Sequence, residues 1–402
     1  MKIAYFTDLF LPKIDGVAVS VANFSRELGE RGHQVIIFAP KQQEKLSFKE
    51  PNVEVFFLSS ISLPAYPDLR LGTGILSKTF EKVKKFNPDI FHFQIPLTIG
   101  TQGVILAKIL DRPLVGTFHA FLTEKEYLKF IKIKKAVGPL QELFLSFQKF
   151  YYGACDVAIT PCYSLKKDLL KAGFNKKPIK VIPSGMNLKK AVCLSEKEAL
   201  KLKEKMGLRH KVVLHFGRLS GEKSVDIVLK SAKLVIEEDH QTSFLIIGDG
   251  PILKDLKALV KKLRISDKIK FTGAIQHDKL LSSGILSIAD VFVTASKMES
   301  QGMVVIEAMA TGLPIIGARK AALPEVIGSA GLLVKPDNPQ DLAEKTLRVL
   351  TDEKLKAEMR KSSLKRAKEF SIEKSTDKLL ELYQELIEKR KGNGRSSFLQ
   401  RF

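Results

Sequence analysis

The hydrophobic positions of the chain fall into short runs typical of buried β-strands, separated by segments with the periodicity of helices. Between the first two runs, apolar residues recur at helical spacing and a glycine ends the segment, at Val17, Val21, Phe24, Leu28 and Gly32. Alternating strands and helices form parallel sheets whose faces helices cover. The pattern therefore predicts an α/β fold with two Rossmann-like, doubly wound domains. The expected strands cover residues 2–7, 34–40, 53–58, 89–94 and 113–119, then 211–219, 243–250, 268–273, 290–296 and 313–318.

Proline and glycine cluster after a β-rich run at residues 181–190, which read VIPSGMNLKK. Such a cluster is typical of a boundary between two folded segments. We therefore expect one Rossmann-like domain at residues 1–186, a second at 187–370, and a helix with a basic tail at 371–402. Two such domains that face each other form a cleft, and ligands bind at the carboxyl ends of the strands.

The composition is that of a soluble globular protein, with 45% hydrophobic and 27% charged residues among 402. The cysteines Cys155, Cys162 and Cys193 lack the paired spacing of a disulfide framework or a zinc ribbon. The first residues, MKIAYFTDLF, lack the pattern of a secretory signal, and no apolar run approaches the roughly 20 residues that span a bilayer. We therefore expect the protein to be located in the cytoplasm.

The formal net charge is +22, and the excess of basic residues is spread over both halves of the chain. Nucleic acid, an anionic membrane surface or a phosphorylated substrate could each exploit this charge, and a generally basic proteome is the alternative explanation. Nucleic acid is disfavoured because no recognised binding motif appears and the basic residues are not interleaved with aromatic ones along one strand face.

Candidate phosphate-binding residues follow several of the expected strands. Arg218 and Lys223, in HFGRLSGEKS, lie on one turn, where two cations can neutralise a diphosphate; a solvated basic turn is the alternative. Gly250, in GDGP, allows a close backbone approach or simply a tight turn. Gly16 begins the first helix, where free amides attract phosphate. No Asp-x-Asp pair occurs, so metal-bridged diphosphate chemistry through such a pair is unsupported.

Two acids flank the start of an apolar helix in MESQGMVVIEAMATG, residues 298–312. Gly302 begins this helix, whose free amides favour an anion. Glu299, just before it, can accept hydrogen bonds from hydroxyls near that anion, and Glu307 can bind a second pair, such as those of a ribose. With the Arg218–Lys223 turn, the segment predicts a nucleotide-sugar site. Two histidines lie in or after the expected strands. His215 is expected in the core, and His119 is either a site residue or a polar side chain whose hydrogen bonds are satisfied within the fold.

These segments together resemble the retaining family-4 glycosyltransferases of the GT-B fold, over nearly the whole chain. The Glu-x7-Glu pattern with the upstream Arg and Lys is the most specific part. The resemblance implies that Arg218 and Lys223 hold the diphosphate, that Glu299 and His119 contact the sugar, and that Glu307 binds the ribose. It implies no metal and no cofactor. Donor contacts are also implied at Gly16, Gly217, Gly250, Ala274, Ile275, Gln301, Gly302, Met303 and Val304.

The resemblance further implies transfer of a hexose from a nucleoside-diphosphate sugar, with UDP-glucose as the first choice and GDP-mannose as the second. The sequence ESQG is similar to that of the diacylglycerol glucosyltransferase branch, which favours a lipid acceptor. The alternative is a mannosyl or other hexosyl transferase acting on a soluble or polyprenyl-linked glycan. In this fold the last helix crosses back to the first domain, so we expect residues 371–389 to pack there.

Other enzymes of similar architecture are less consistent with the residues. No Gly-x-Gly-x-x-Gly follows the first strand, which disfavours a nicotinamide-dependent oxidoreductase. An epimerase or a phosphorylase on the same fold is closer, but the covalent lysine–cofactor site of a phosphorylase is not recognisable.

A segment rich in basic and aromatic residues follows His119, at residues 120–156. Lysines alternate with apolar residues over 124–135, which suits docking onto anionic lipid or equally a solvated helix face. Residues 140–152 are expected to form an ordinary core helix. With a lipid acceptor, this pattern predicts a peripheral enzyme at the inner face of the cell membrane.

Overall fold

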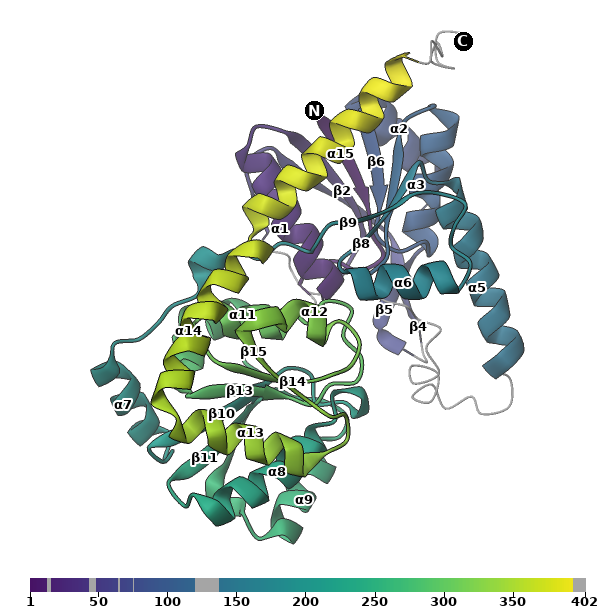
Figure 1. Cartoon of the computed structure of the whole chain (residues 1–402). Coiled ribbons are helices and arrows are strands. Elements are labelled where there is room, and N and C mark those ends of the chain that lie inside the picture. Colours follow the sequence, from purple (N-terminus) through teal and green to yellow (C-terminus); the bar gives the residue numbers. More distant parts are fainter. Residues whose placement is uncertain (13–15, 43–47, 64–65, 75, 120–136, 393–402) are drawn as a thin grey trace. The chain divides into compact units, whose positions relative to one another are not determined.

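The computed structural model describes residues 1–12, 16–42, 48–63, 66–74, 76–119 and 137–392 (Figure 1). The chain divides into two compact units, one comprising Met1–Gly185 with Ile372–Phe402 and the other Met186–Ser371. Each unit is an α/β layer structure with its own parallel sheet. The predicted fold class, two Rossmann-like domains, is confirmed.

The sheet of the first unit has the strand order β3-β2-β1-β6-β7-β8-β9, with every pairing parallel. Five of these strands lie where the hydrophobic runs predicted them, and the last two were not predicted. An antiparallel pair, β4–β5, was also missed and is separate from the main sheet. The strands are β1 (Lys2–Phe6), β2 (Gln34–Pro40), β3 (Val53–Leu58), β4 (Ser60–Leu63), β5 (Tyr66–Gly72), β6 (Ile90–Phe93), β7 (Leu114–Thr117), β8 (Val157–Thr160) and β9 (Ile179–Val181).

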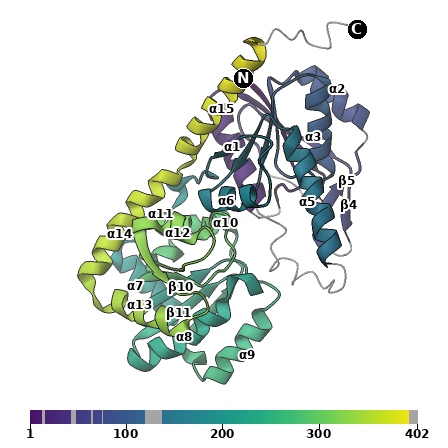
Figure 2. The ribbon, with the colours of Figure 1, turned by 45° about the vertical axis from the view of Figure 1, so that its right-hand side comes forward.

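The helices of the first unit cover both faces of this sheet (Figures 1 and 2). The first helix ends as its sequence predicts, because Gly32, two residues beyond it, adopts the left-handed backbone with φ +81°. The helices are α1 (Gly16–Glu30), α2 (Leu76–Phe86), α3 (Thr98–Ile109), α5 (Val137–Ala154), α6 (Tyr163–Lys171) and α15 (Ile372–Gly392).

The last helix, α15, packs into the core of the first unit beside α1, as predicted. Its Leu379, Leu382 and Tyr383 are buried among residues of β1, β2 and α1. The Tyr383 hydroxyl lies 3.2 Å from the Tyr5 hydroxyl and 2.6 Å from His92 Nδ1. Apolar burial and a buried polar network therefore both attach the C-terminal helix to this sheet.

The second unit has a six-stranded parallel sheet of order β12-β11-β10-β13-β14-β15, of which only the last strand was not predicted. Its strands are β10 (Lys211–Phe216), β11 (Thr242–Ile247), β12 (Ile269–Gly273), β13 (Val291–Thr294), β14 (Ile315–Ala318) and β15 (Gly331–Val334). Its helices are α7 (Glu196–Lys205), α8 (Val225–Glu238), α9 (Leu253–Leu263), α10 (His277–Ser282), α11 (Met303–Ala310), α12 (Leu323–Ile327), α13 (Pro339–Thr351) and α14 (Glu353–Ala367).

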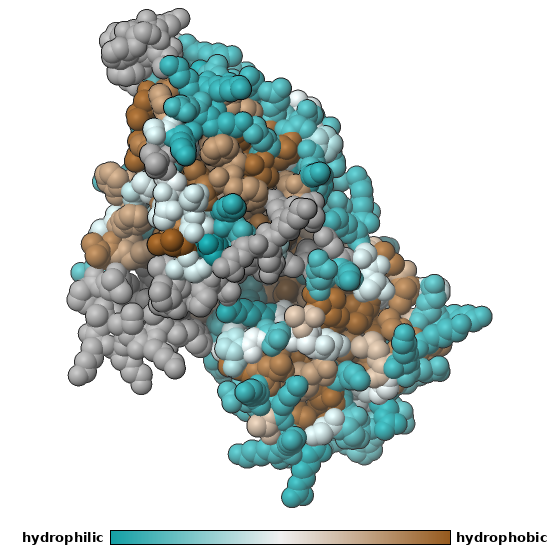
Figure 3. Space-filling model, turned by 180° about the vertical axis from the view of Figure 1, so that it is seen from behind, coloured by the Kyte–Doolittle hydropathy of each residue, from teal (hydrophilic) through white to brown (hydrophobic). Residues whose placement is uncertain are grey.

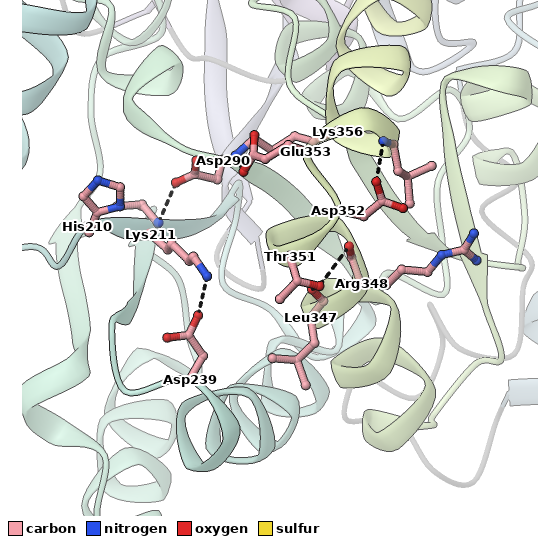
Figure 4. Close-up of polar contacts among 12 residues, drawn as sticks. His210, Lys211, Asp239, Asp290, Leu347, Arg348, Thr351, Asp352, Glu353 and Lys356 are labelled. Carbon is pink, nitrogen blue, oxygen red and sulfur yellow. Dashed lines mark hydrogen bonds and ion pairs between the residues drawn. The ribbon is translucent and has the colours of Figure 1, made fainter.

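Ion pairs gather at the amino ends of the central strands of this second sheet (Figure 4). Asp290, just before β13, accepts a hydrogen bond of 2.9 Å from the Val212 amide and lies 3.4 Å from the ammonium groups of Lys203 and Lys356. Lys211 pairs with Asp239 at 2.8 Å. These contacts satisfy charges within the fold at the strand edge opposite to the one where this architecture binds ligands.

Hydrophobic side chains form patches among hydrophilic ones on the back of the molecule (Figure 3). Within the described residues, the large apolar side chains that are more than half exposed all belong to the first unit: Ile61, Leu143, Phe150 and Tyr163. No helix in the described part of the chain is long and apolar enough to cross a bilayer.

The expectation of a core helix at residues 140–152 is only partly correct. Tyr152 of α5 is buried, whereas Leu143 is 67% exposed and Phe150 is 73% exposed. These two residues lie seven positions apart, so they share one face of the helix. The residues 124–135, for which two readings were open, lie outside the described residues.

Candidate functional site

The carboxyl ends of β10 and β11 meet through a close backbone contact between two glycines. Gly217 follows β10 with φ +139°, and its amide donates to the Ile247 carbonyl at 3.0 Å. A Cβ on Gly248 would lie 1.9 Å from the Gly217 oxygen, so no larger residue fits there. Gly250 is equally restricted, because its Cβ would lie 2.2 Å from the Leu219 oxygen. These glycines hold the loop that carries Arg218 against the next loop.

The loops after β10 and β13 bring together two predicted site residues. Lys223 ends the short 3₁₀ helix η2 (Gly221–Lys223), and its ammonium lies 2.7 Å from Glu299 Oε1. The Lys297 amide donates to the Glu222 carbonyl at 2.9 Å, which joins the two loops through their backbones. The Glu299 side chain is 9% exposed and that of Lys223 23%, so this ion pair is screened less than a surface pair.

The N-terminus of α11 lies beside this ion pair. Gly302 precedes the helix with φ +70°, and its Cβ position is 3.9 Å from the Glu299 Cβ. Val305 is the first residue of α11 whose amide donates to an acceptor, the Gly302 carbonyl, at 2.9 Å. The amides of Met303 and Val304 have no acceptor within the described part of the chain. Such free amides at a helix start, next to a cation, form a site suited to an anion.

Glu307 and Gln301 are the buried polar members of this segment, 4% and 3% exposed. Glu307 lies in the second turn of α11, which is otherwise apolar. Both residues have interaction partners in the structure. A carboxylate this buried is unusual for a solvated helix face, so its position indicates a specific role.

The other predicted donor residues of the second unit lie on the same strand edge. Arg218 is exposed, two residues beyond β10. Ala274 and Ile275 follow β12, whose last residue, Gly273, accepts a hydrogen bond of 2.9 Å from the Gly248 amide. Gly217 faces α11, since its Cβ position is 3.6 Å from Val304 Cγ1. The structure therefore brings the second-unit candidates to one edge of one sheet.

His215 is buried in β10, as expected, but it also lies within the electrostatic influence of the site. Its Nδ1 is 2.9 Å from the Val293 carbonyl, so Nδ1 carries the proton. The pKa of His215 is lowered to about 4, mainly by burial and also by the charge of Lys223, while the hydrogen bond to Val293 and the charge of Glu299 oppose this shift. Its Nε2 has no hydrogen-bond partner among the described residues. This proximity was not predicted from the sequence.

In the first unit, His119 follows β7 and pairs with a residue that the sequence did not point to. His119 Nε2 lies 2.7 Å from Gln94 Oε1, and Gln94 is 4% exposed. Since the amide oxygen only accepts, Nε2 carries the proton and Nδ1 is left as an acceptor. Burial lowers the pKa of His119 to about 4, so the ring is neutral near pH 7.

The other candidate of the first unit is Gly16, the first residue of α1, where a Cβ would meet open space. Asp8, which the sequence did not single out, binds the start of α3. It accepts hydrogen bonds from the amides of Thr98, Ile99 and Gly100 at 3.1, 2.9 and 3.0 Å, and from the Thr98 hydroxyl at 2.7 Å. Burial raises the pKa of the Asp8 carboxyl, and these hydrogen bonds oppose that shift. Asp8 therefore supplies the acceptors that the start of α3 lacks.

The described residues contain no group of three or more His, Cys, Asp or Glu side chains that could hold a metal ion. What the second-unit site offers is an ion pair, an exposed arginine, free helix amides and a buried carboxylate. Lys223 and the α11 amides can bind an anion. The two glutamates can bind hydroxyl groups.

Residues 14–190 match the family model described as Glycosyltransferase Family 4, and residues 196–366 match the one described as Glycosyl transferases group 1. An alpha-monoglucosyldiacylglycerol synthase of Streptococcus pneumoniae is 29% identical over 320 residues, covering 79% of this chain and 70% of that protein. A GDP-mannose-dependent alpha-mannosyltransferase of Corynebacterium glutamicum is 25% identical over 397 residues, covering 96% of this chain and 89% of that protein.

Among solved structures, Anabaena Alr3699/HepE in complex with UDP-glucose matches with a TM-score of 0.75 at 19% identity, covering 96% of this chain and 100% of that one. This likeness shows the fold, which is GT-B. The two family models together span most of the chain, and the chain belongs to the family-4 glycosyltransferases. It is an enzyme that transfers glycosyl groups.

Proposed function

We propose that the enzyme transfers a hexose to a hydroxyl group of a membrane lipid such as diacylglycerol, with retention at the anomeric carbon. The preferred donor in this proposal is UDP-glucose. The observation that carries the donor half of this proposal is the Lys223–Glu299 pair at the start of α11. It combines a cation, free amides and a carboxylate at one strand edge. A sugar diphosphate offers the complementary groups, an anion next to hydroxyls.

The donor binds to the second unit in this proposal. Arg218, Lys223 and the amides of Gly302, Met303 and Val304 hold the diphosphate. Glu299 accepts hydrogen bonds from the sugar, and Glu307 accepts them from the ribose. The backbone around Ala274 and Ile275 takes the base. The first unit binds the acceptor, and its His119 is the proposed contact to the donor sugar.

The chemistry is a substitution at the anomeric carbon. The bond from this carbon to the diphosphate oxygen breaks, the bond to the acceptor oxygen forms on the same face, and the hydroxyl proton passes to the departing diphosphate. Negative charge grows on the leaving oxygens, so Arg218 and Lys223 stabilise the transition state more than the bound donor. No carboxylate nucleophile is assigned to the opposite face.

Two features support a lipid acceptor. The Streptococcus pneumoniae relative is an alpha-monoglucosyldiacylglycerol synthase. The chain also combines a formal charge of +22 with exposed apolar side chains on its first unit, which suits a peripheral enzyme at the cytoplasmic face of an anionic membrane.

Mannosyl transfer from GDP-mannose to a soluble or polyprenyl-linked glycan is the second candidate. The Corynebacterium glutamicum relative, a GDP-mannose-dependent alpha-mannosyltransferase, supports it over 96% of this chain. Binding of GDP-mannose requires the same contacts to a diphosphate and to hydroxyl groups, so the geometry of the second unit is compatible with either donor.

The test is release of nucleoside diphosphate from a panel of donors, each with and without detergent-dispersed diacylglycerol, followed by NMR of the product's anomeric configuration. We expect release from UDP-glucose that depends on the lipid and gives an α-linked glucolipid. Release from GDP-mannose alone would replace the first candidate by the second. A β-linked product would contradict retention.

A further inference from the structure

A cavity of about 80 Å³ opens at the surface of the first unit, between the ends of α5 and α6 and the starts of β8 and β9. Aromatic rings form its floor and lysines form its rim: Phe118, Tyr152 and Phe174, then Lys149, Lys176 and Lys177. None of the proposed donor or catalytic residues lines it. The cavity is therefore a feature that the transfer reaction does not explain.

The floor presents only apolar surface. Phe118 and Tyr152 stack on one another, and Phe174 meets Phe118 edge-on with a centroid distance of 5.0 Å. The one polar atom of these rings, the Tyr152 hydroxyl, already donates to the Thr117 carbonyl at 2.8 Å. A ligand on this floor gains hydrophobic contact and no hydrogen bond from it.

The rim has the opposite character. The half-buried Lys149 places its ammonium 5.9 Å from the centroid of the Phe174 ring. Lys176 passes over Gly153, with its Cδ 3.7 Å from the Cβ position there. Within the described part of the chain, no acidic side chain pairs with any of these three lysines, unlike the nearby Lys180, which lies 3.8 Å from Glu385. Three unpaired cations around an apolar floor attract an anion that carries an apolar part.

We propose that this cavity binds one acidic glycerophospholipid, with its phosphate among the rim lysines and the start of an acyl chain on the aromatic floor. Phe150 follows Lys149 in α5 and is 73% exposed, and Leu143, seven residues earlier on the same helix face, is 67% exposed. A lipid bilayer is the environment in which these side chains and the three cations are all satisfied. The inference rests on the proposed function in one respect, that an enzyme acting on a lipid works at a membrane.

Gly153 allows the cavity to be filled without any change in charge. It lines the cavity near the end of α5, and among the described residues the flexible stem of Lys176 is the neighbour within 4 Å of its Cβ position. A Gly153→Leu variant therefore extends into the cavity, while a helix is stabilised when glycine is replaced by leucine. We expect this variant to keep or raise the unfolding midpoint and to lose the lipid.

The experiment is sedimentation of the full chain with phosphatidylcholine vesicles that contain or lack phosphatidylglycerol. We expect wild-type partitioning to rise with phosphatidylglycerol and to fall by about tenfold in Gly153→Leu and in the pair Lys176→Glu, Lys177→Glu. The matched control is the pair Lys166→Glu, Lys167→Glu on α6, which has the same charge change but does not line the cavity. It should retain most of the partitioning.

Two results would overturn the site: Gly153→Leu that binds like the wild type, or the control pair losing as much as the cavity pair. If inorganic phosphate at low concentration displaces the protein from vesicles as well as a water-soluble short-chain phosphatidylglycerol does, the ligand is a free anion and the lipid assignment is wrong. Transfer to detergent-dispersed acceptor is measured in parallel. It should be unchanged in every variant, so a failure of the proposed function is seen in the wild type and not in these comparisons.

Discussion

The ammonium of Lys223 lies 2.7 Å from the carboxylate of Glu299, although 76 positions separate the two residues in the chain. Each side chain is largely buried, so each holds the other in one orientation beside the start of α11. A bound diphosphate offers the lysine a second anion, and the sugar hydroxyls offer the glutamate new donors. The pair is therefore preorganised for a ligand that carries both groups.

Lys223→Ala should lower turnover by about 10²–10³ while the protein stays folded, by analogy with the loss of one donor that stabilises transition-state charge. The measurement is the steady-state rate of nucleoside-diphosphate release. The matched control is Lys211→Ala, which also breaks an ion pair: Lys211 is the first residue of β10 and pairs with Asp239 at 2.8 Å, at the opposite end of the strand (Figure 4). Turnover near wild type in Lys223→Ala, or an equal loss in Lys211→Ala, would remove Lys223 from this role.

Glu299→Gln keeps the size of the side chain and removes its charge. We expect it to lower kcat/KM, and we expect the double variant with Lys223→Ala to lose less than the product of the two single losses, because the residues act as one unit. The same cycle on Lys211→Ala and Asp239→Asn supplies the comparison, with little loss in any variant. Independent, multiplicative losses at Lys223 and Glu299 would show that the two residues are not coupled in the reaction.

Long apolar runs made most of the fold predictable. A strand such as Gln34–Pro40 is buried along nearly its whole length, so its residues are almost all hydrophobic and its position is evident. Strand length does not explain the misses, since β6 and β13 are also only four residues long and were predicted. The missed strands of the two parallel sheets are β8, β9 and β15, of three or four residues each. Their place is decided by the neighbouring strands with which they pair, which the local sequence does not contain.

The site was predictable where it depends on strand ends. Lys223 and Glu299 follow β10 and β13, which are neighbours in the sheet, so their proximity follows from the order of strands. The partner of His119 was missed, although Gln94 follows β6 and the same rule applies to the paired strands β6 and β7. The unpartnered Nε2 of His215 could not be foreseen, because it depends on the register that sets the Val293 carbonyl against Nδ1.

Asp8→Ala should destabilise the first unit by about 3 kcal/mol, because three amides and a hydroxyl at the start of α3 lose their common acceptor in a buried place. Asp8→Asn keeps one acceptor oxygen and should lose less. Chemical denaturation checks this, with Asp89→Ala as the control, since the Asp89 carboxylate accepts one backbone hydrogen bond, from Lys2 at 2.7 Å. If Asp89→Ala costs as much as Asp8→Ala, the clustered acceptors at α3 are not what stabilises the helix.

His215→Phe should make stability less dependent on pH. Burial lowers the pKa of His215 from its usual 6.5 to about 4, so between these values the folded chain binds fewer protons than the unfolded chain. The free energy of unfolding that comes from the neutral ring is therefore fully present above pH 6.5 and is lost as the pH falls toward 4. Lys223 favours the neutral form and Glu299 opposes it, and both remain in the variant.

Phenylalanine suits this test because the His215 ring lies parallel to that of Phe292, with centroids 6.2 Å apart, and an apolar ring can keep this packing. Near neutral pH the variant should be less stable by about 1 kcal/mol, since the Val293 carbonyl loses its donor. Between about pH 7 and pH 4.5, the wild type should then lose on the order of 2 kcal/mol more than the variant, measured by chemical denaturation at each pH. His92 and His119 also have lowered pKa values, and because they titrate in both proteins they cancel in this difference. Parallel pH profiles of wild type and variant would show that His215 is not the group that couples protonation to unfolding.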